Sequence, residues 1–386
     1  MNTAEIETAL RNLERTTLTR YVRAALNSES AEVRAWGYQA IGIGRGSATG
    51  GVYRVTGTAD DHGVAQSWAL VVKVLSPLAA GNVPAVTEDI AHPLYWKREA
   101  LAYQSGLLDD LPTGMRAPRC FAVEERDSTI WLWIEAVEDD GGQRWSLAQY
   151  AQAARLLGNF NGAYVAGRAM PPHAWLSRDG SPRGVLDHFA WMQDVVRDPA
   201  TWAQPMVRAA YPIPVADRLL RLWADRGALL DRFEQLPTTL CHLDAWRKNM
   251  FAPSGVDGSL VVIDWAYVGR GVIGTDAGDL MGASYGLFGA EPCTPAALDA
   301  VIFDHYIKGL EEAGWHGDRQ LVRLAYATFT ALKYAGLLLE LHDVRDQDKH
   351  ARWEAVAGQP MDALMRHKAA LTYFLLDLAD EARQLR

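Results

Sequence analysis

One short polar stretch, residues 242–249, constrains this chain more than any other part of it. It reads His-Leu-Asp-Ala-Trp-Arg-Lys-Asn, and the apolar run Leu260-Val261-Val262-Ile263 later leads to Asp264. A carboxylate in a loop, such as that of Asp244, can orient a hydroxyl group. An amide at Asn249 and a second carboxylate at Asp264 can hold Mg²⁺ through oxygen. The stretch therefore predicts one site for phosphate and metal.

The same residues resemble the catalytic loop of the aminoglycoside phosphotransferase and choline kinase family, whose members are relatives of protein kinases. The family pattern is H-x-D-x-x-x-x-N followed by a strand ending in I-D-W. Every fixed position is filled, by His242, Asp244, Asn249, Ile263, Asp264 and Trp265. Two departures are Leu243, where the antibiotic kinases usually carry Gly, and Trp246-Arg247-Lys248, where many have His-Pro-Gly. Both concern the identity of the substrate more than the reaction.

This resemblance implies an α+β fold of the bilobal protein kinase type. The N-terminal lobe, residues 1–136, is expected to hold a small antiparallel sheet, an acidic helix and one extra amphipathic helix over residues 3–26 with Thr3 as its N-cap. The C-terminal lobe, residues 137–386, is expected to be large and mainly helical, with helices over 147–164, 216–233, 297–313, 318–342, 352–356 and 361–386.

A glycine-rich segment, residues 42–51, lies between a predicted strand over 33–43 and another that starts at Val52. Glycines allow backbone N–H groups to approach an anion without obstruction by Cβ. The segment lacks G-x-x-x-x-G-K-[ST], so it is not a Walker loop. It resembles the family's nucleotide-positioning loop, which implies that Ser47 contacts phosphate.

Lys73 is the one charged residue in the apolar strand 68–75. Lysine is seldom buried without a partner. The resemblance makes it the cation that holds the α- and β-phosphates. Glu99, in the predicted helix 95–104, is its expected partner, and Glu88 is the weaker alternative.

The predicted strands 120–123 and 129–134 are followed by an acidic, glycine-containing segment. This segment resembles the hinge between kinase lobes. The resemblance implies that the Ile134 carbonyl and the Ala136 amide meet the edge of adenine.

Further polar residues are candidates for support of the loop or for the acceptor. Asp279-Leu280 matches the end of the family's G-D-P-x-x-D-L, so Asp279 is expected to brace the catalytic loop, whereas Asp276 could face the acceptor. Tyr334, Glu340 and His342 could reach the acceptor from a C-terminal helix, although packing is the commoner role for such residues.

Composition excludes several classes of function. The 386 residues are 49% hydrophobic and 22% charged with a formal net charge of −9, and no basic patch stands out, so nucleic acid is not expected as a partner. No run of about eighteen apolar residues is present, so no membrane span is expected. Three scattered cysteines and an N-terminus unlike a signal peptide favour the cytoplasm. The chain could act as a monomer or a homodimer.

The resulting hypothesis is a kinase that transfers the γ-phosphoryl group of ATP or GTP to a hydroxyl of a small molecule. Asp244 would orient that hydroxyl, Asn249 and Asp264 would bind Mg²⁺, and Lys73 would hold the phosphates. His242 would fix the loop, and Arg247 or Lys248 would neutralise charge on the transferred group.

Several alternatives stay open at this level. The acceptor could be an antibiotic of the aminoglycoside or nucleoside type, which implies a resistance enzyme, or a metabolite such as choline, a sugar or an amino alcohol. A nucleotide-binding relative without turnover is a second class of function. A protein kinase is disfavoured because D-F-G and A-P-E are absent. A metal-dependent hydrolase that uses His242, Asp244 and Asp264 would explain neither the glycine-rich segment nor Lys73.

Overall fold

The computed structural model describes residues 2–42, 48–77, 87–138, 145–178, 180–251, 259–288 and 293–385. The chain divides into two compact units. The first unit comprises Met1–Asp139, Pro171–Arg178 and Val261–Val268, and the second comprises Asp140–Met170, Asp179–Leu260 and Gly269–Arg386. Asp264, assigned by sequence to the C-terminal lobe, therefore belongs to the first unit.

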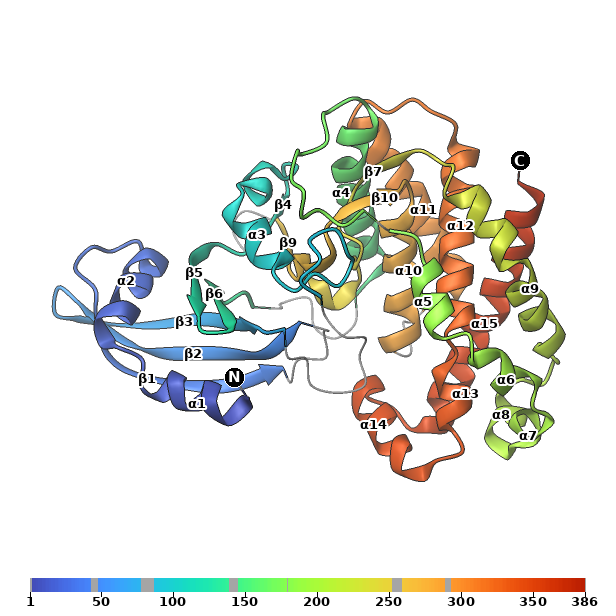
Figure 1. Ribbon diagram of the computed structural model, residues 1–386, viewed down its shortest axis with the longest axis horizontal. Coiled ribbons are helices and arrows are strands. Elements are labelled where there is room, and N and C mark those ends of the chain that lie inside the picture. Colours follow the sequence, from blue (N-terminus) through green and yellow to red (C-terminus); the bar gives the residue numbers. More distant parts are fainter. Residues whose placement is uncertain are drawn as a thin grey trace. The chain divides into compact units, whose positions relative to one another are not determined.

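A five-stranded antiparallel sheet with the order β1-β2-β3-β6-β5 forms the centre of the first unit (Figure 1). Its strands are β1 (Glu32–Gly42), β2 (Thr49–Asp61), β3 (Val64–Leu75), β5 (Cys120–Arg126) and β6 (Thr129–Glu135). Strand β6 is buried along almost its whole length, as expected for a strand that is covered on both faces. Its Trp131 and Trp133 are fully buried and belong to the hydrophobic core of this unit.

Two helices precede the sheet, so the prediction of one helix over residues 3–26 is wrong. Helix α1 (Thr3–Arg11) and helix α2 (Arg15–Leu26) are separated by a short break. Each presents its own apolar face, with Ile6 and Leu18 among the buried residues, to the same core. One straight helix could not bury both faces against the twisted sheet. The N-cap is Asn2 rather than Thr3, in a capping box with Glu5.

The acidic helix α3 (Arg98–Gln104) starts three residues later than predicted. Tyr95 instead forms an isolated bridge with Thr87. The first unit also contains η1 (Leu107–Asp110), β4 (Met115–Arg116), most of β9 (Leu260–Val262) and η3 (Trp265–Tyr267).

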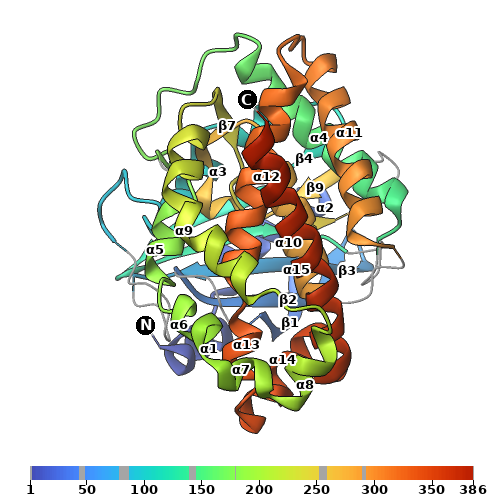
Figure 2. The same cartoon turned by 90° about the vertical axis from the view of Figure 1, so that its right-hand side faces the viewer.

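The second unit is mainly helical. Its long helices are α4 (Leu147–Val165), α9 (Ala216–Phe233), α10 (Thr275–Phe288), α11 (Pro295–Glu312), α12 (Arg319–Gly336), α14 (Gln347–Ala357) and α15 (Met361–Gln384). Its shorter elements are α5 (Arg183–His188), α6 (Met192–Arg197), α7 (Pro199–Ala203), α8 (Pro205–Ala210), α13 (Leu339–Asp343), β7 (Thr238–Cys241), η2 (Arg247–Asn249), β8 (Met250–Phe251) and β10 (Gly269–Val272). Figure 2 shows α15 running beside α12, and the two helices pack together.

The helix predicted over residues 318–342 is interrupted. Helix α12 ends at Gly336 and α13 begins at Leu339. Leu337 and Leu338 leave the helical region of the backbone, and Leu338 and Leu341 are buried at the break. The break lets the chain turn and bury both leucines. The predicted α+β class, with an antiparallel sheet in the N-terminal part and a mainly helical remainder, is confirmed.

No helix in the described ranges is both long and apolar enough to traverse a lipid bilayer.

Candidate active site

Lys73 is the centre of a buried group of charges in the first unit. It lies on β3, opposite Leu132 of β6, and only 7% of the residue is exposed. Its Nζ lies 2.6 Å from Glu99 Oε2 and 2.8 Å from Asp264 Oδ1. The predicted pairing of Lys73 with Glu99 is confirmed. Glu88, the alternative, instead accepts a hydrogen bond from Trp96 Nε1 at 2.6 Å.

Two carboxylates share this one ammonium group. Burial opposes the charge on Lys73, but Asp264 and Glu99 outweigh that effect and raise the pKa of Lys73. Burial raises the pKa of Glu99 to about 7, against the attraction of Lys73 and with the help of the Asp264 charge. The group therefore has one negative charge to spare when all three residues are ionised.

Asp264 is the most accessible member of the group. Its side chain is 32% exposed, whereas those of Lys73 and Glu99 are 9% and 2% exposed. Its backbone is left-handed, with φ of 62°, and Trp265 is buried directly after it, with Nε1 donating to the Val262 carbonyl at 2.9 Å. The fold thus fixes the backbone at Asp264 while its carboxylate stays within reach of solvent.

The donor chemistry suits a hard divalent cation. In the described part of the chain, no cluster of three or more His, Cys, Asp or Glu could hold a metal ion. A cation beside Asp264 would depend on few side-chain oxygens and would be completed by phosphate oxygens and water. That ligand set is the one Mg²⁺ uses in nucleotide-dependent enzymes.

The remaining residues predicted to bind nucleotide have less informative surroundings. Ile134 lies near the end of β6, paired with Val71 of β3 and Cys120 of β5, and it is buried. Ala136 follows the strand directly. Ser47 lies outside the described residues.

In the second unit, Asp244 and Asn249 are bonded to each other. Asn249 Nδ2 donates to Asp244 Oδ2 at 2.8 Å and to the Asp244 carbonyl at 2.9 Å. The backbone N–H of Asp244 donates to Nδ1 of the fully buried His242 at 3.2 Å. These contacts support a structural role for His242, which shapes the loop around Asp244.

Asp276 anchors this loop, so the expectation that Asp279 would brace it is wrong. The backbone N–H groups of His242 and Leu243 donate to the Asp276 carboxylate, each at 2.9 Å. Asn161 Nδ2 donates to the same carboxylate at 2.9 Å. Asp276 is fully buried, so the alternative that it faces the acceptor is also wrong.

Asp279 lies one helical turn later on α10 and has other partners. Its Oδ1 accepts from Lys333 Nζ at 2.5 Å and from Tyr334 Oη at 2.6 Å. Sequence spacing alone could not choose between Asp276 and Asp279, because both are acids on one helix. Only the position of the loop in the folded chain separates Asp276 from Asp279.

Leu243 has a left-handed backbone, with φ of 65°, at the position where related antibiotic kinases usually carry Gly. A Cβ added to Gly271 would lie 2.7 Å from Leu243 Cδ2, and one added to Gly180 would lie 2.9 Å from the same atom. Two glycines therefore make room for the leucine side chain. The leucine at this position is thus accommodated by its local packing.

Arg247 is placed differently from the expectation. Only 3% of it is exposed, and its guanidinium lies 4.7 Å from the centre of the Trp145 ring. Its Nη1 donates to the Met250 carbonyl at 3.3 Å, and its backbone N–H donates to Ser284 Oγ at 3.0 Å. This packing favours a role in holding the loop over direct contact with a transferred group.

The three residues considered for the acceptor do not share one environment. Tyr334 is bonded to Asp279. Glu340 is fully buried, 3.8 Å from Lys368 Nζ. His342 is exposed and packs edge-on against Trp191.

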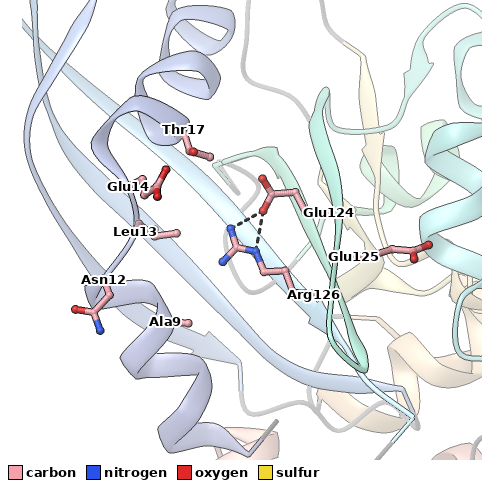
Figure 3. Close-up of a pocket in the computed structure, with 8 residues that line it drawn as sticks. All are labelled: Ala9, Asn12, Leu13, Glu14, Thr17, Glu124, Glu125 and Arg126. Carbon is pink, nitrogen blue, oxygen red and sulfur yellow. Dashed lines mark hydrogen bonds and ion pairs between the residues drawn. The ribbon is translucent and has the colours of Figure 1, made fainter.

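The first unit also has a surface pocket of about 490 Å³ (Figure 3). It is lined by Ala9, Asn12, Leu13, Glu14, Thr17, Glu124, Glu125 and Arg126. None of the residues predicted for nucleotide, metal or catalysis lines it. Glu124 is engaged by Arg126, whose Nε donates to it at 3.0 Å, so the acidic lining is partly neutralised.

The fold and the Lys73 group define a phosphotransferase of the kinase type, and a family model agrees. The model of the "Phosphotransferase enzyme family" matches residues 70–321, which is more than half of the chain. The chain belongs to this family, and the resemblance identified from the catalytic loop is confirmed. It is a small-molecule phosphotransferase with a hydroxyl group as acceptor.

Similar solved structures include three small-molecule kinases. A spectinomycin phosphotransferase in complex with ADP and spectinomycin is 13% identical, with 97% of this chain and 99% of that chain covered and a TM-score of 0.47. An amicoumacin kinase with AMP-PNP and Ca²⁺ is 15% identical, with 92% and 96% covered and a TM-score of 0.47. A Plasmodium vivax ethanolamine kinase is 13% identical, with 96% and 90% covered and a TM-score of 0.48. A search of curated proteins found no match.

Proposed function

We propose that this chain transfers the γ-phosphoryl group of ATP or GTP to a hydroxyl group of a small-molecule antibiotic of the aminoglycoside or nucleoside type. The observation that most strongly supports phosphoryl transfer from a nucleotide is the Lys73 ammonium, buried and 2.6 Å and 2.8 Å from two carboxylates. Burial of a cation of this kind costs free energy unless the cation is paired, and here two carboxylates pair with it. Here it would hold the phosphates that are not transferred.

Asp244 is the residue we assign to the acceptor hydroxyl. It is partly exposed, and its backbone N–H is held by His242 Nδ1. The Asn249 amide fixes the orientation of the Asp244 carboxylate. A carboxylate held in this way can accept the proton of an attacking hydroxyl, a contribution typically worth about 10²–10⁴ in rate.

Asn249 and Asp264 are the residues we assign to a divalent cation, with Mg²⁺ the expected ion. When bound, such a cation neutralises charge on the phosphate oxygens. The nucleotide base would be met by the Ile134 carbonyl and the Ala136 amide, and Ser47 would contact phosphate. His242 and Arg247 would hold the loop that carries Asp244.

A turnover assay with a broad panel of acceptors tests this proposal. Purified protein is incubated with ATP or GTP and Mg²⁺ against aminoglycosides, nucleoside antibiotics, choline, ethanolamine and sugars, and phosphorylated product is detected by mass spectrometry. Product with antibiotics alone supports the proposal. Product with choline, ethanolamine or sugars alone would instead identify a metabolic kinase.

Asp244→Ala is the matched test of mechanism. We expect kcat to fall about 10²–10⁴-fold with nucleotide affinity unchanged, because only the proton acceptor is lost. Asp194→Ala is the control, since Asp194 is 82% exposed and, among the residues that the structure describes, its carboxylate pairs only with the neighbouring Arg197 on its own helix. Wild-type turnover by Asp244→Ala would refute the assignment. Tight nucleotide binding with no product across the panel would identify a binding protein without turnover.

A further inference from the structure

Arg98 is the first residue of α3, next to Glu99, and it is fully buried. Within the described part of the chain, no carboxylate forms an ion pair with it. Its guanidinium instead donates to four backbone carbonyls. The acceptors are Trp175 O at 2.7 Å from Nε, Pro93 O and Ala266 O at 2.6 and 3.1 Å from Nη1, and His92 O at 2.7 Å from Nη2.

These carbonyls belong to three segments that are distant in sequence. His92 and Pro93 precede α3, Trp175 lies in the segment 171–178, and Ala266 lies in η3. All three segments belong to the first compact unit. Arg98 therefore joins the helix that carries Glu99 to the turn that follows Asp264.

The turn after Asp264 needs external support. Asp264 has a left-handed backbone, a conformation that non-glycine residues keep only where the surroundings over-determine it. The Ala266 carbonyl, two residues later, is bonded to Arg98. A second bond, from Ser177 N–H to the Val268 carbonyl at 3.1 Å, holds the end of the same turn to the segment that Arg98 also binds.

We propose that Arg98 is a positioning residue that sets the Asp264 carboxylate against Lys73 and Glu99, and thereby sets the affinity for the divalent cation and for the nucleotide. The proposal rests on the function proposed above. Partners in the outer shell of a metal site typically change metal affinity or activity by about 10–100-fold when they are lost.

The geometry requires arginine at this position. The guanidinium presents its N–H groups in a rigid planar fork, whereas an ammonium is a compact point charge with three donors. One lysine could not reach four carbonyls spread around that fork. Burial lowers the pKa of Arg98 to about 10, which still leaves it charged at neutral pH, so its N–H groups remain available to the four carbonyls.

Two variants test whether the guanidinium group is needed: Arg98→Lys keeps the positive charge without the planar fork, and Arg98→Met removes both. We expect both variants to raise the half-saturating Mg²⁺ concentration and the KM for ATP by about 10-fold or more, with the KM of the acceptor unchanged. Arg23→Met is the matched control in the same unit, because Arg23 also donates to a backbone carbonyl, that of Ala31 at 2.8 Å. It should leave all three constants at wild-type values.

Two further measurements do not depend on turnover. Binding of a non-hydrolysable ATP analogue, measured by calorimetry with and without Mg²⁺, should lose its enhancement by Mg²⁺ in both Arg98 variants. Amide exchange of a peptide that covers residues 263–268 should become faster in both variants and stay unchanged in Arg23→Met.

The outcomes distinguish this inference from the proposed function. If wild-type protein phosphorylates no acceptor, the binding and exchange measurements still decide the role of Arg98. Folded Arg98 variants with wild-type Mg²⁺ dependence and wild-type exchange would overturn the inference. Failure of both variants to fold, with Arg23→Met intact, would also overturn it, because Arg98 would then support the fold as a whole.

Discussion

Two loops, one in each compact unit, contain a non-glycine residue with a left-handed backbone beside a predicted functional carboxylate. In the second unit Leu243 precedes Asp244, and in the first unit the left-handed residue is Asp264 itself. The two loops are held by buried charges of opposite sign. Asp276 accepts N–H groups from its loop, whereas Arg98 donates to carbonyls around the other. The sign of each buried charge suits its backbone partners: the Asp276 carboxylate accepts from N–H groups, and the Arg98 guanidinium donates to carbonyl groups.

The two loops also differ in how the charge of their carboxylates is compensated. Lys73, Glu99 and Asp264 form a group of full charges, so their pKa values depend on one another. Asp276 receives backbone and side-chain N–H groups instead. Burial raises the pKa of Asp276, against the attraction of His242 and these hydrogen bonds. Removal of Asp276 should therefore destabilise the fold, whereas changes within the charged group should appear mainly as pH dependence.

The largest effect is expected from Asp276→Ala. It leaves three N–H donors, the buried ones on His242 and Asn161 and the part-buried one on Leu243, without this acceptor. Each such loss costs about 1–3 kcal/mol, so we expect the free energy of unfolding to fall by about 3–9 kcal/mol in urea denaturation.

Asp276→Asn serves as the control for this variant, since it retains an acceptor oxygen and should lose less stability. A loss below about 1 kcal/mol in Asp276→Ala would be smaller than the cost of a single unsatisfied donor. It would show that the loop does not depend on Asp276.

The second effect concerns Glu99 and the dependence of stability on pH. The pKa of Glu99 in the folded protein, about 7, exceeds the ordinary value of 4.5. The folded state therefore binds the proton more tightly, and the contribution of Glu99 to stability is lost as pH rises from about 4.5 to 7. The shift corresponds to about 3 kcal/mol.

Urea denaturation at several pH values should show this loss in the wild type and not in Glu99→Gln. Glu88→Gln, at an exposed acid, should follow the wild-type profile. Parallel profiles for wild type and Glu99→Gln would mean that Lys73 keeps Glu99 ionised throughout.

Sequence could predict what depends on local pattern. The five strands follow from alternation and turns, and the pairing of Lys73 with Glu99 follows from a lone lysine in an apolar strand near an acidic helix. The family follows from fixed spacing in one loop. Each of these signals is contained within a short segment.

What sequence could not predict depends on contacts between distant segments. Asp276 and Asp279 are equivalent in helical pattern, and only the folded position of the loop selects Asp276. Arg98 reads as an ordinary helix cation, because its partners are backbone carbonyls that no side-chain pattern reveals. The packing of Leu243 could not be predicted either, because the two glycines that make room for it are far away in sequence.

The smallest effect tests whether Leu243 is accommodated by those glycines. In Gly271→Ala the new methyl group would lie 2.7 Å from Leu243 Cδ2 and 2.9 Å from Cys241 Sγ, and overpacking of this kind costs about 1–3 kcal/mol. Leu243→Gly removes the first contact and also relieves the left-handed backbone, so the double variant should recover about 1 kcal/mol relative to the sum of the single changes. Gly184→Ala is the control, because a Cβ there meets no atom within 4 Å. Strict additivity in thermal or urea denaturation would mean that Leu243 is not the neighbour that limits residue 271.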